Sequence, residues 1–261
     1  MGNLLSAHFA RLWKTRVFWV LLAILLAFAV WPIPREIEII SDPRNVPQER
    51  WCLMLFDHAR LLGPVLAIFV SLFSGGEYDS GAVRNKLISG YTRTAVYLSS
   101  LFAVTAAAFL LCLSYTAVAA VGGWFVLGPM EDASPVLPHL LTVLFMCLSY
   151  CALFTLVGMN CPKTALSVLL CLGLTGAMFV ACQFFISNVI LFLSSIDADD
   201  KAAALYFLYY LLPMGQGDRL RNIQRGSPFD IPPLRLIPYS VLFTTAVTAA
   251  GLLLFRRKNI K

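Results

Sequence analysis

Residues 94–130 have the sequence TAVYLSSLFAVTAAAFLLCLSYTAVAAVGGWFVLGPM, thirty-seven consecutive positions without Asp, Glu, Lys or Arg. The run shows no alternation of polar and apolar residues, so it predicts a helix and not a strand. About 20 apolar residues cross the roughly 30 Å hydrocarbon layer of a bilayer. The run is too long for one straight crossing and too short for two with a turn. We therefore expect one long, tilted membrane span that ends near Gly122 and Gly123, followed by an interfacial tail.

The rest of the chain has the same apolar character. Hydrophobic residues make up 59% of the 261 positions and charged residues 13%, which is far from the balance of a soluble domain. A bilayer core admits only helices or closed barrels, and long apolar runs select helices. We predict an all-α polytopic membrane protein, one transmembrane domain over residues 1–261 with six spanning helices. The other five spans are expected at residues 17–33, 51–76, 139–159, the first part of 164–196, and 236–255.

Three connecting segments have their own patterns. Residues 1–16 place apolar side chains at helical spacing opposite Arg11 and Lys14, which predicts an amphipathic elbow helix lying in the interface. Residues 34–50 hold three prolines and seven charged residues, and we expect a solvated loop there. The end of the uncharged run 164–196 is expected to bend back as a re-entrant or interfacial helix. The apolar positions of the elbow are Leu5, Phe9, Leu12 and Trp13.

The distribution of Lys and Arg predicts the orientation. With six spans, eleven of the 20 basic residues and two of the 14 acids share one side with both chain ends. An excess of Lys and Arg marks the cytoplasmic face. If residues 202–217 also crossed, there would be seven spans, and the basic C-terminus argues against an odd number. We expect both ends in the cytoplasm of a bacterial cell, with the chain in its inner (plasma) membrane.

Several functions are excluded by missing motifs. The sequence holds no phosphate-binding loop, no H-E-x-x-H, no G-x-S-x-G and no dinucleotide glycine fingerprint. Its basic residues form no aromatic-interleaved stripe, so no nucleic-acid partner is expected. The seven cysteines lie mostly within apolar runs without disulfide or zinc spacing, and we interpret them as packing residues. We expect no enzyme activity, cofactor or metal in this chain.

The centres of the predicted spans carry no charge. Ion-coupled carriers usually place ionisable residues or broken helices there, so the energy for any transport should come from a partner. The histidines His8, His58 and His139 lie at or outside the expected span ends. We interpret Asp57, His58 and Arg60 as an interfacial anchor or local salt bridge, with lining of a substrate path as the alternative.

The most informative segment, residues 75–93, has the sequence GGEYDSGAVRNKLISGYTR and follows the second span. Ser80 is expected to cap a short helix, and Gly90 to end it. Val83, Leu87 and Ile88 are expected on one face of this helix. Arg84, Asn85 and Lys86 are expected on the other. The pattern predicts a polar-edged helix on the inner membrane surface.

This run, E-Y-x-x-G-x-x-R-N-K-L-x-x-G-x-x-R, is similar to that of the type-two ABC exporter permeases (ABC-2 family). The family includes permeases of bacterial antibiotic- and bacteriocin-peptide export and self-immunity systems. Weaker matches are Leu212-Pro213 with Gln216 and the aromatic-basic ending 255–261, whereas Ala82 and Asn259 depart from the usual Thr and Asp. The resemblance implies a coupling helix within residues 77–93 that docks on an ATP-binding subunit. The implied coupling residues are Glu77, Tyr78, Gly81, Arg84, Asn85, Lys86, Leu87, Gly90 and Arg93.

The resemblance also implies the other parts of an exporter: its partner subunits, its exit gate and its cargo. Two copies of the ATP-binding subunit, which binds ATP and Mg, would join a dimer of permease subunits that are identical or homologous. Residues 197–235 would form an extracellular segment with a re-entrant hairpin that shapes an exit gate, and from the sequence alone its aromatic residues, Tyr209 included, form an interfacial belt. The cargo would be a hydrophobic or amphipathic peptide antibiotic, lipid or drug. The implied gate residues are Tyr206, Phe207, Tyr210, Pro213 and Gln216.

Two other classes of function remain open. An intramembrane or lipid-modifying enzyme needs polar catalytic groups at matched depth. The one adjacent acid–base pair, Asp57 and His58, points about 100° apart on a helix, which is poor geometry for cooperation. An ATP-independent channel or immunity protein would show no ATP-binding partner.

Overall fold

The computed structural model describes residues 2–40, 47–130, 132–195, 199–221 and 231–258. The described residues are 89% helical and contain no strand. Within them, six helices are long and apolar enough to cross a membrane. These six spans are Arg16–Ile39, Arg50–Tyr78, Arg93–Leu127, Val136–Asn160, Thr164–Ile190 and Pro233–Arg257.

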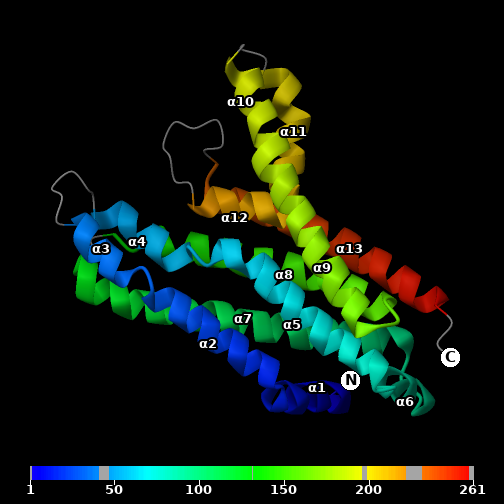
Figure 1. The fold of residues 1–261 in the computed structure, drawn as a ribbon. Helices are drawn as coiled ribbons and strands as arrows, with labels where there is room; N and C mark the ends of the chain where they lie inside the picture. The colour runs from blue at the N-terminus through cyan, green and yellow to red at the C-terminus, as the bar shows by residue number, and fades with distance from the viewer. Residues whose placement is uncertain (1, 41–46, 131, 196–198, 222–230, 259–261) are drawn as a thin grey trace.

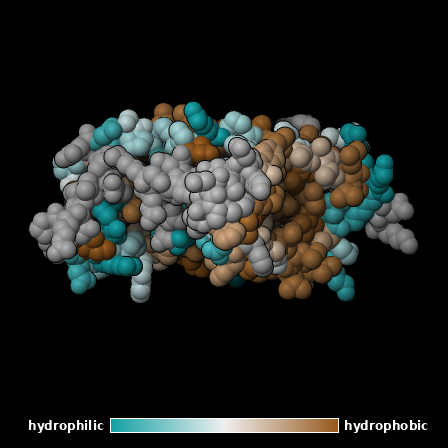
Figure 2. Space-filling model, turned by 90° about the horizontal axis from the view of Figure 1, so that it is seen from above, coloured by the Kyte–Doolittle hydropathy of each residue, from teal (hydrophilic) through white to brown (hydrophobic). Residues whose placement is uncertain are grey.

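The helices run mostly along one long axis, with α3 and α4 at one end and α6 at the other (Figure 1). Figure 2, which views the molecule from above, shows a hydrophobic area on that face, with hydrophilic residues toward the two ends of the long axis. The prediction of a multi-pass, all-α membrane protein is therefore confirmed. The elements are α1 (Gly2–Lys14), α2 (Arg16–Val30), α3 (Ile33–Ile40), α4 (Pro47–Phe56), α5 (Ala59–Asp79), α6 (Ala82–Ile88), α7 (Arg93–Leu127), α8 (Val136–Asn160), α9 (Thr164–Val180), the π-helix η1 (Ala181–Ile186), α10 (Ser187–Ser195), α11 (Asp199–Leu211), α12 (Pro213–Arg221), the 3-10 helix η2 (Pro233–Leu236) and α13 (Ile237–Arg257).

The long helix α7 shows how local signals set the ends of a span. Thr92 caps its start, since the Thr92 hydroxyl accepts a hydrogen bond from the Ala95 N–H at 3.2 Å. Gly128, with φ of +75°, follows its last residue. Thirty-five residues make a helix of about 52 Å. The expected end near Gly122 and Gly123 was wrong, because the helix continues unbroken through both glycines.

Two expectations for the connecting segments were also wrong. Residues 34–50 are not simply a loop: α3 continues the helical path of the first span to Ile40, and α4 begins at Pro47, while residues 41–46 lie outside the described part. Charged side chains are tolerated in these helices because Arg50 donates to Glu36 across α3 and α4, with Nε 2.8 Å from Oε2. The fifth span does not turn back after its first part either. Its helical path continues through η1 to Ser195, and α11 packs back along α10 (Figure 1).

The core of the bundle is formed by α5, α7 and α8. In these three spans 56–67% of the most apolar stretch is buried, against 22%, 28% and 17% in the spans of α2, α9 and α13. The outer three therefore present apolar side chains to lipid or to another subunit. Small residues allow close approach to the core helices: a Cβ added at Gly63 of α5 would lie 2.9 Å from the Thr175 methyl group of α9.

Helix α1 packs on the start of α7. Of its four predicted apolar positions, Leu12 is buried, Leu5 and Phe9 are partly buried, and Trp13 is 52% exposed, so the predicted face was only partly right. His8 lies buried on the same side as Leu12. The polar residue in the middle of the buried face belongs to the site described next.

Candidate functional site

The carboxylate of Glu77 is the centre of a buried charged cluster at the end of the bundle that carries α6. Lys86 Nζ lies 3.0 Å from each of its oxygens, and Arg11 Nη1 lies 2.8 Å from Oε1. His8 Nδ1 lies 3.1 Å from the same oxygen. Only 1% of the Glu77 side chain is exposed, so these partners replace the water that the charge has lost. One carboxylate thereby joins α1, α5 and α6.

The partners of Glu77 make further contacts that extend the cluster. Arg11 Nη2 donates to the Phe73 carbonyl at 3.1 Å, and the guanidinium carbon lies 4.9 Å from the centre of the Phe73 ring. His8 Nε2 lies 3.2 Å from Lys86 Nζ and 3.3 Å from the Ser99 hydroxyl on α7. The elbow helix is therefore fixed to two spans and to α6 by polar contacts and not only by its apolar face.

The joint between α5 and α6 depends on a glycine. Ser80 was expected to cap α6, and that expectation was wrong: its hydroxyl donates to the Gly76 carbonyl at 2.7 Å and closes the end of α5. Gly81 has φ of +68° and begins α6, a left-handed conformation that suits glycine. Gly90, with φ of +86°, follows the end of α6 as predicted. Two tight turns thus hold a seven-residue helix at a fixed angle.

The two faces of α6 differ from the predicted ones. Val83 is 1% exposed and Leu87 packs beside it, against Tyr97 and Phe255. Ile88, expected on the same face, is 73% exposed, and Lys86, expected on the polar face, points inward to Glu77. The buried charge of Glu77 provides the physical reason for the inward turn of Lys86. The outward face therefore consists of Arg84, Asn85 and Ile88.

The beginning of α7 is tied to the end of α13. Arg93 Nη1 donates to the carbonyls of Phe255, Arg256 and Lys258 at 3.3, 2.7 and 2.7 Å. These carbonyls lie at a helix C-terminus, where backbone acceptors lack partners and a cation is favoured. Lys258 in turn lies 3.9 Å from the centre of the Tyr78 ring and donates to the Asn160 carbonyl at 3.0 Å. Partial burial lowers the pKa of the Lys258 ammonium.

The nine residues of the predicted coupling segment therefore divide into two groups. Arg84 and Asn85 face outward. The other seven build the support beneath them, through ion pairs, ring contacts, left-handed turns and packing. Those seven are Glu77, Tyr78, Gly81, Lys86, Leu87, Gly90 and Arg93.

The five predicted gate residues lie together where α11, α12 and α13 meet. The Tyr206 and Tyr210 rings are stacked, with centroids 6.2 Å apart, and Phe207 is 47% exposed beside Tyr239 of α13. The Gln216 side chain is fully buried: its Nε2 donates to the Tyr210 carbonyl, and its Oε1 accepts from Ser240, both at 2.7 Å. Pro213 begins α12.

The polar helix α12 is buried against α5 and α8. Asp218 accepts a hydrogen bond of 2.6 Å from the Tyr209 hydroxyl, and its other oxygen lies 3.9 Å from Arg60 Nη2. Arg60 thus takes part in a salt bridge, but not in the local one that the sequence suggested. Its partner is 158 positions away in the chain, and nothing local in the sequence points to Asp218.

His58 differs from the interfacial position expected for it. The ring is fully buried, with Nε2 3.1 Å from the Cys112 sulfur and its centroid 4.3 Å from that of Tyr115 on α7. All seven cysteines are unpaired and buried. A thiol and an imidazole in contact resemble a nucleophile with its base, but no substrate reaches a fully buried pair, so the geometry gives the enzyme alternative no support.

No protein-family model and no curated protein matches the sequence. A function is therefore inferred from the residues and their geometry. Sequence reasoning missed His8 and Asp218 as partners of the predicted residues. The spacing of His8 and Arg11, three positions apart on one helix face, is the signal that could have pointed to a shared partner.

Proposed function

We propose that the chain is the membrane-spanning subunit of an ATP-driven ABC exporter, in which a separate subunit hydrolyses ATP. The observation that carries the proposal is α6: a short helix presents Arg84, Asn85 and Ile88 outward and is braced from behind by Glu77. An isolated surface helix of seven residues would be unstable. Bracing of this kind suits a helix that has to transmit force.

The contacts of Glu77 and Arg93 indicate which other helices would shift if α6 moved. Through Lys86 and Glu77 the movement would pass to the end of α5, and through Arg11 and His8 to the elbow. Closure of the ATP-binding subunits would then shift α1, α5 and α7 together. The free energy for transport would come from contacts that differ between the open and closed states.

Other elements of the proposal follow from the same arrangement. The α6 end would be cytoplasmic, with both chain ends on that side of a bacterial inner membrane. The largely unburied spans α2, α9 and α13 would face lipid and a second permease subunit, identical or homologous. The α11–α12 junction around Tyr210 and Gln216 would form the exit gate, and the cargo would be hydrophobic or amphipathic, as in antibiotic-peptide export and resistance.

The test is to purify the chain gently from its native host and to measure the ATPase activity that co-purifies. The double variant Arg84→Glu with Ile88→Glu should lose that activity while inserting and folding normally, because both side chains face outward. Lys163→Glu reverses one positive charge, as Arg84→Glu does, at an exposed turn on the same end of the bundle; it serves as the control and should retain the activity.

Two results would overturn the proposal. One is a wild-type chain that emerges without any ATP-hydrolysing partner, which would favour the ATP-independent channel or immunity protein. The other is an unchanged ATPase yield from the double variant, which would mean that α6 is not the docking element.

A further inference from the structure

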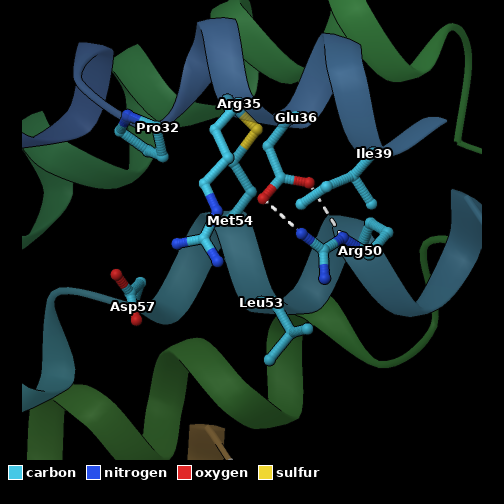
Figure 3. A pocket seen from close by; sticks show the side chains of 8 residues that line it. All are labelled: Pro32, Arg35, Glu36, Ile39, Arg50, Leu53, Met54 and Asp57. Carbon is cyan, nitrogen blue, oxygen red and sulfur yellow. Dashed lines mark hydrogen bonds and ion pairs between the residues drawn. The ribbon is translucent and has the colours of Figure 1, made fainter. Parts of the chain in front are cut away.

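A polar pocket of about 190 Å³ lies between α3 and α4, at the end of the bundle opposite α6. Its charged lining residues are Arg35, Glu36, Arg50 and Asp57 (Figure 3). Glu36 and Arg50 face each other and form an ion pair. The Arg35 side chain extends into the pocket on the side of Asp57. Within the described ranges Arg35 has no hydrogen bond or ion pair, so its guanidinium is available to a ligand.

An apolar groove of about 370 Å³ lies between the end of α2 and α7. It is lined only by apolar residues, among them Val30, Ala117 and Val121. Val30 and Val121 are 51% and 59% exposed and belong to two membrane spans. The groove therefore opens on the surface that faces hydrocarbon, and its size is within the range of small-molecule sites.

The pocket and the groove adjoin each other at Gly122 of α7. A Cβ added there would lie 2.7 Å from the Ile33 side chain and 3.3 Å from that of Met54. Ile33 lines the groove, and Met54 lines the pocket. The charged pocket and the apolar groove are therefore close enough for one amphiphilic molecule to occupy both. They meet near the end of a membrane span, where headgroups and hydrocarbon adjoin.

We propose that the two cavities together bind one phospholipid molecule of the surrounding bilayer. Its phosphate lies against Arg35, and one acyl chain lies in the groove. A guanidinium matches the oxygens of a phosphate by its fork of N–H donors. Glu36 neutralises the second arginine, and the Asp57 carboxylate brings the formal charge of the pocket to zero, so the phosphate is held by the donors of Arg35 and not by a net positive charge. A cavity of 150 Å³ holds a benzene ring, so a volume of about 190 Å³ accepts a phosphate with part of its glycerol. The site is independent of the proposed export function.

The experiment is native mass spectrometry of the detergent-purified chain with added dioleoylphosphatidylglycerol. We expect one lipid to stay bound, and Arg35→Gln to weaken the apparent affinity about tenfold through the lost charged hydrogen bonds. Arg235→Gln removes an exposed arginine outside the pocket, just before α13, and should leave binding unchanged. Because Arg35 is exposed and unpaired among the described residues, its variant should fold normally.

Two further probes separate the contribution of the lipid phosphate to binding from that of the acyl chains. Dioleoylglycerol, which lacks the phosphate, and inorganic phosphate, which lacks the chain, should each bind at least tenfold more weakly than the phospholipid. Ala117→Phe fills the groove and should reduce lipid retention, whereas Ala249→Phe, at an exposed position on α13, should not. Equal retention by wild type and Arg35→Gln, or equal binding of dioleoylglycerol, would overturn the proposal.

Discussion

The Glu77 carboxylate and the Lys86 ammonium face each other across the turn between α5 and α6, with Lys86 Nζ 3.0 Å from both carboxylate oxygens. Glu77→Gln removes the charge but keeps the size of the side chain. It leaves Lys86, Arg11 and His8 without their common partner, so we expect the free energy of unfolding to fall by about 3 kcal/mol. Thermal unfolding in detergent measures the change.

The control for this prediction is Arg84→Gln on the outward face of α6, which should change the free energy of unfolding by less than about 0.5 kcal/mol. The double variant Glu77→Gln with Lys86→Met should recover part of the loss, because it removes the unpaired ammonium as well. A Glu77→Gln variant as stable as the Arg84→Gln control would show that the cluster does not brace α6.

The two left-handed glycines that flank α6 give a second prediction. Gly81→Ala and Gly90→Ala place a Cβ on residues with φ of +68° and +86°. Each should lower the free energy of unfolding by about 1–2 kcal/mol, although no atom lies within 4 Å of either added Cβ. Gly173→Ala in the middle of α9 also meets open space but has helical φ, so it should be neutral or stabilise by about 0.5–1 kcal/mol. Equal effects at all three positions would contradict the argument from backbone conformation.

The contacts of Arg93 predict the accessibility of the C-terminal tail. Arg93→Met leaves the carbonyls of Phe255, Arg256 and Lys258 without their shared donor. The last turn of α13 should fray, and trypsin should cleave after Arg256 and Arg257 several times faster than in the wild type. Mass spectrometry of the released peptides measures the rate. Thr94→Val, which removes only the contact of Arg256 with α7, should leave cleavage near the wild-type rate.

The even number of spans predicts that both ends lie on one side of the membrane. Epitope tags at the N-terminus and after Lys261 should both be protected from protease in intact cells and both become accessible once the membrane is permeabilised. Tags placed after Asp132, between the third and fourth spans, should show the opposite pattern. Protection of only one end would require residues 202–217 to cross as a seventh span.

The spans themselves follow from the sequence because their length and apolarity are local properties. The run at 94–130 predicted α7 to within a few residues at its start, where Thr92 is a recognisable cap. Its end was misjudged because Gly122 and Gly123, which usually weaken a helix, lie here against Ile33 and Trp51 and leave room for them. Tertiary packing overrode the local preference.

The sequence predicted which segment forms the candidate site, but not how the side chains of that segment are oriented. Turn chemistry pointed to Gly90, and periodicity pointed to Val83. Whether Lys86 faces water or the interior depends on where Glu77 lies, and that depends on α5 remaining helical to Asp79. The contacts of His8 with Glu77 and Ser99, 69 and 91 positions along the chain, have no local signature beyond the spacing of His8 and Arg11 on one helix face.

These distances along the chain have a consequence for how the protein is made. Helix α1 is synthesised before the groups that hold it: Glu77 lies at the end of the second span, and Ser99 lies in the third. Until these groups are made, His8 and Arg11 have none of these partners. An amphipathic helix can wait at the bilayer surface during that interval, with its apolar side chains in the lipid and its cations among the headgroups. Helix α1 therefore takes its final place only after the helices that follow it have been made.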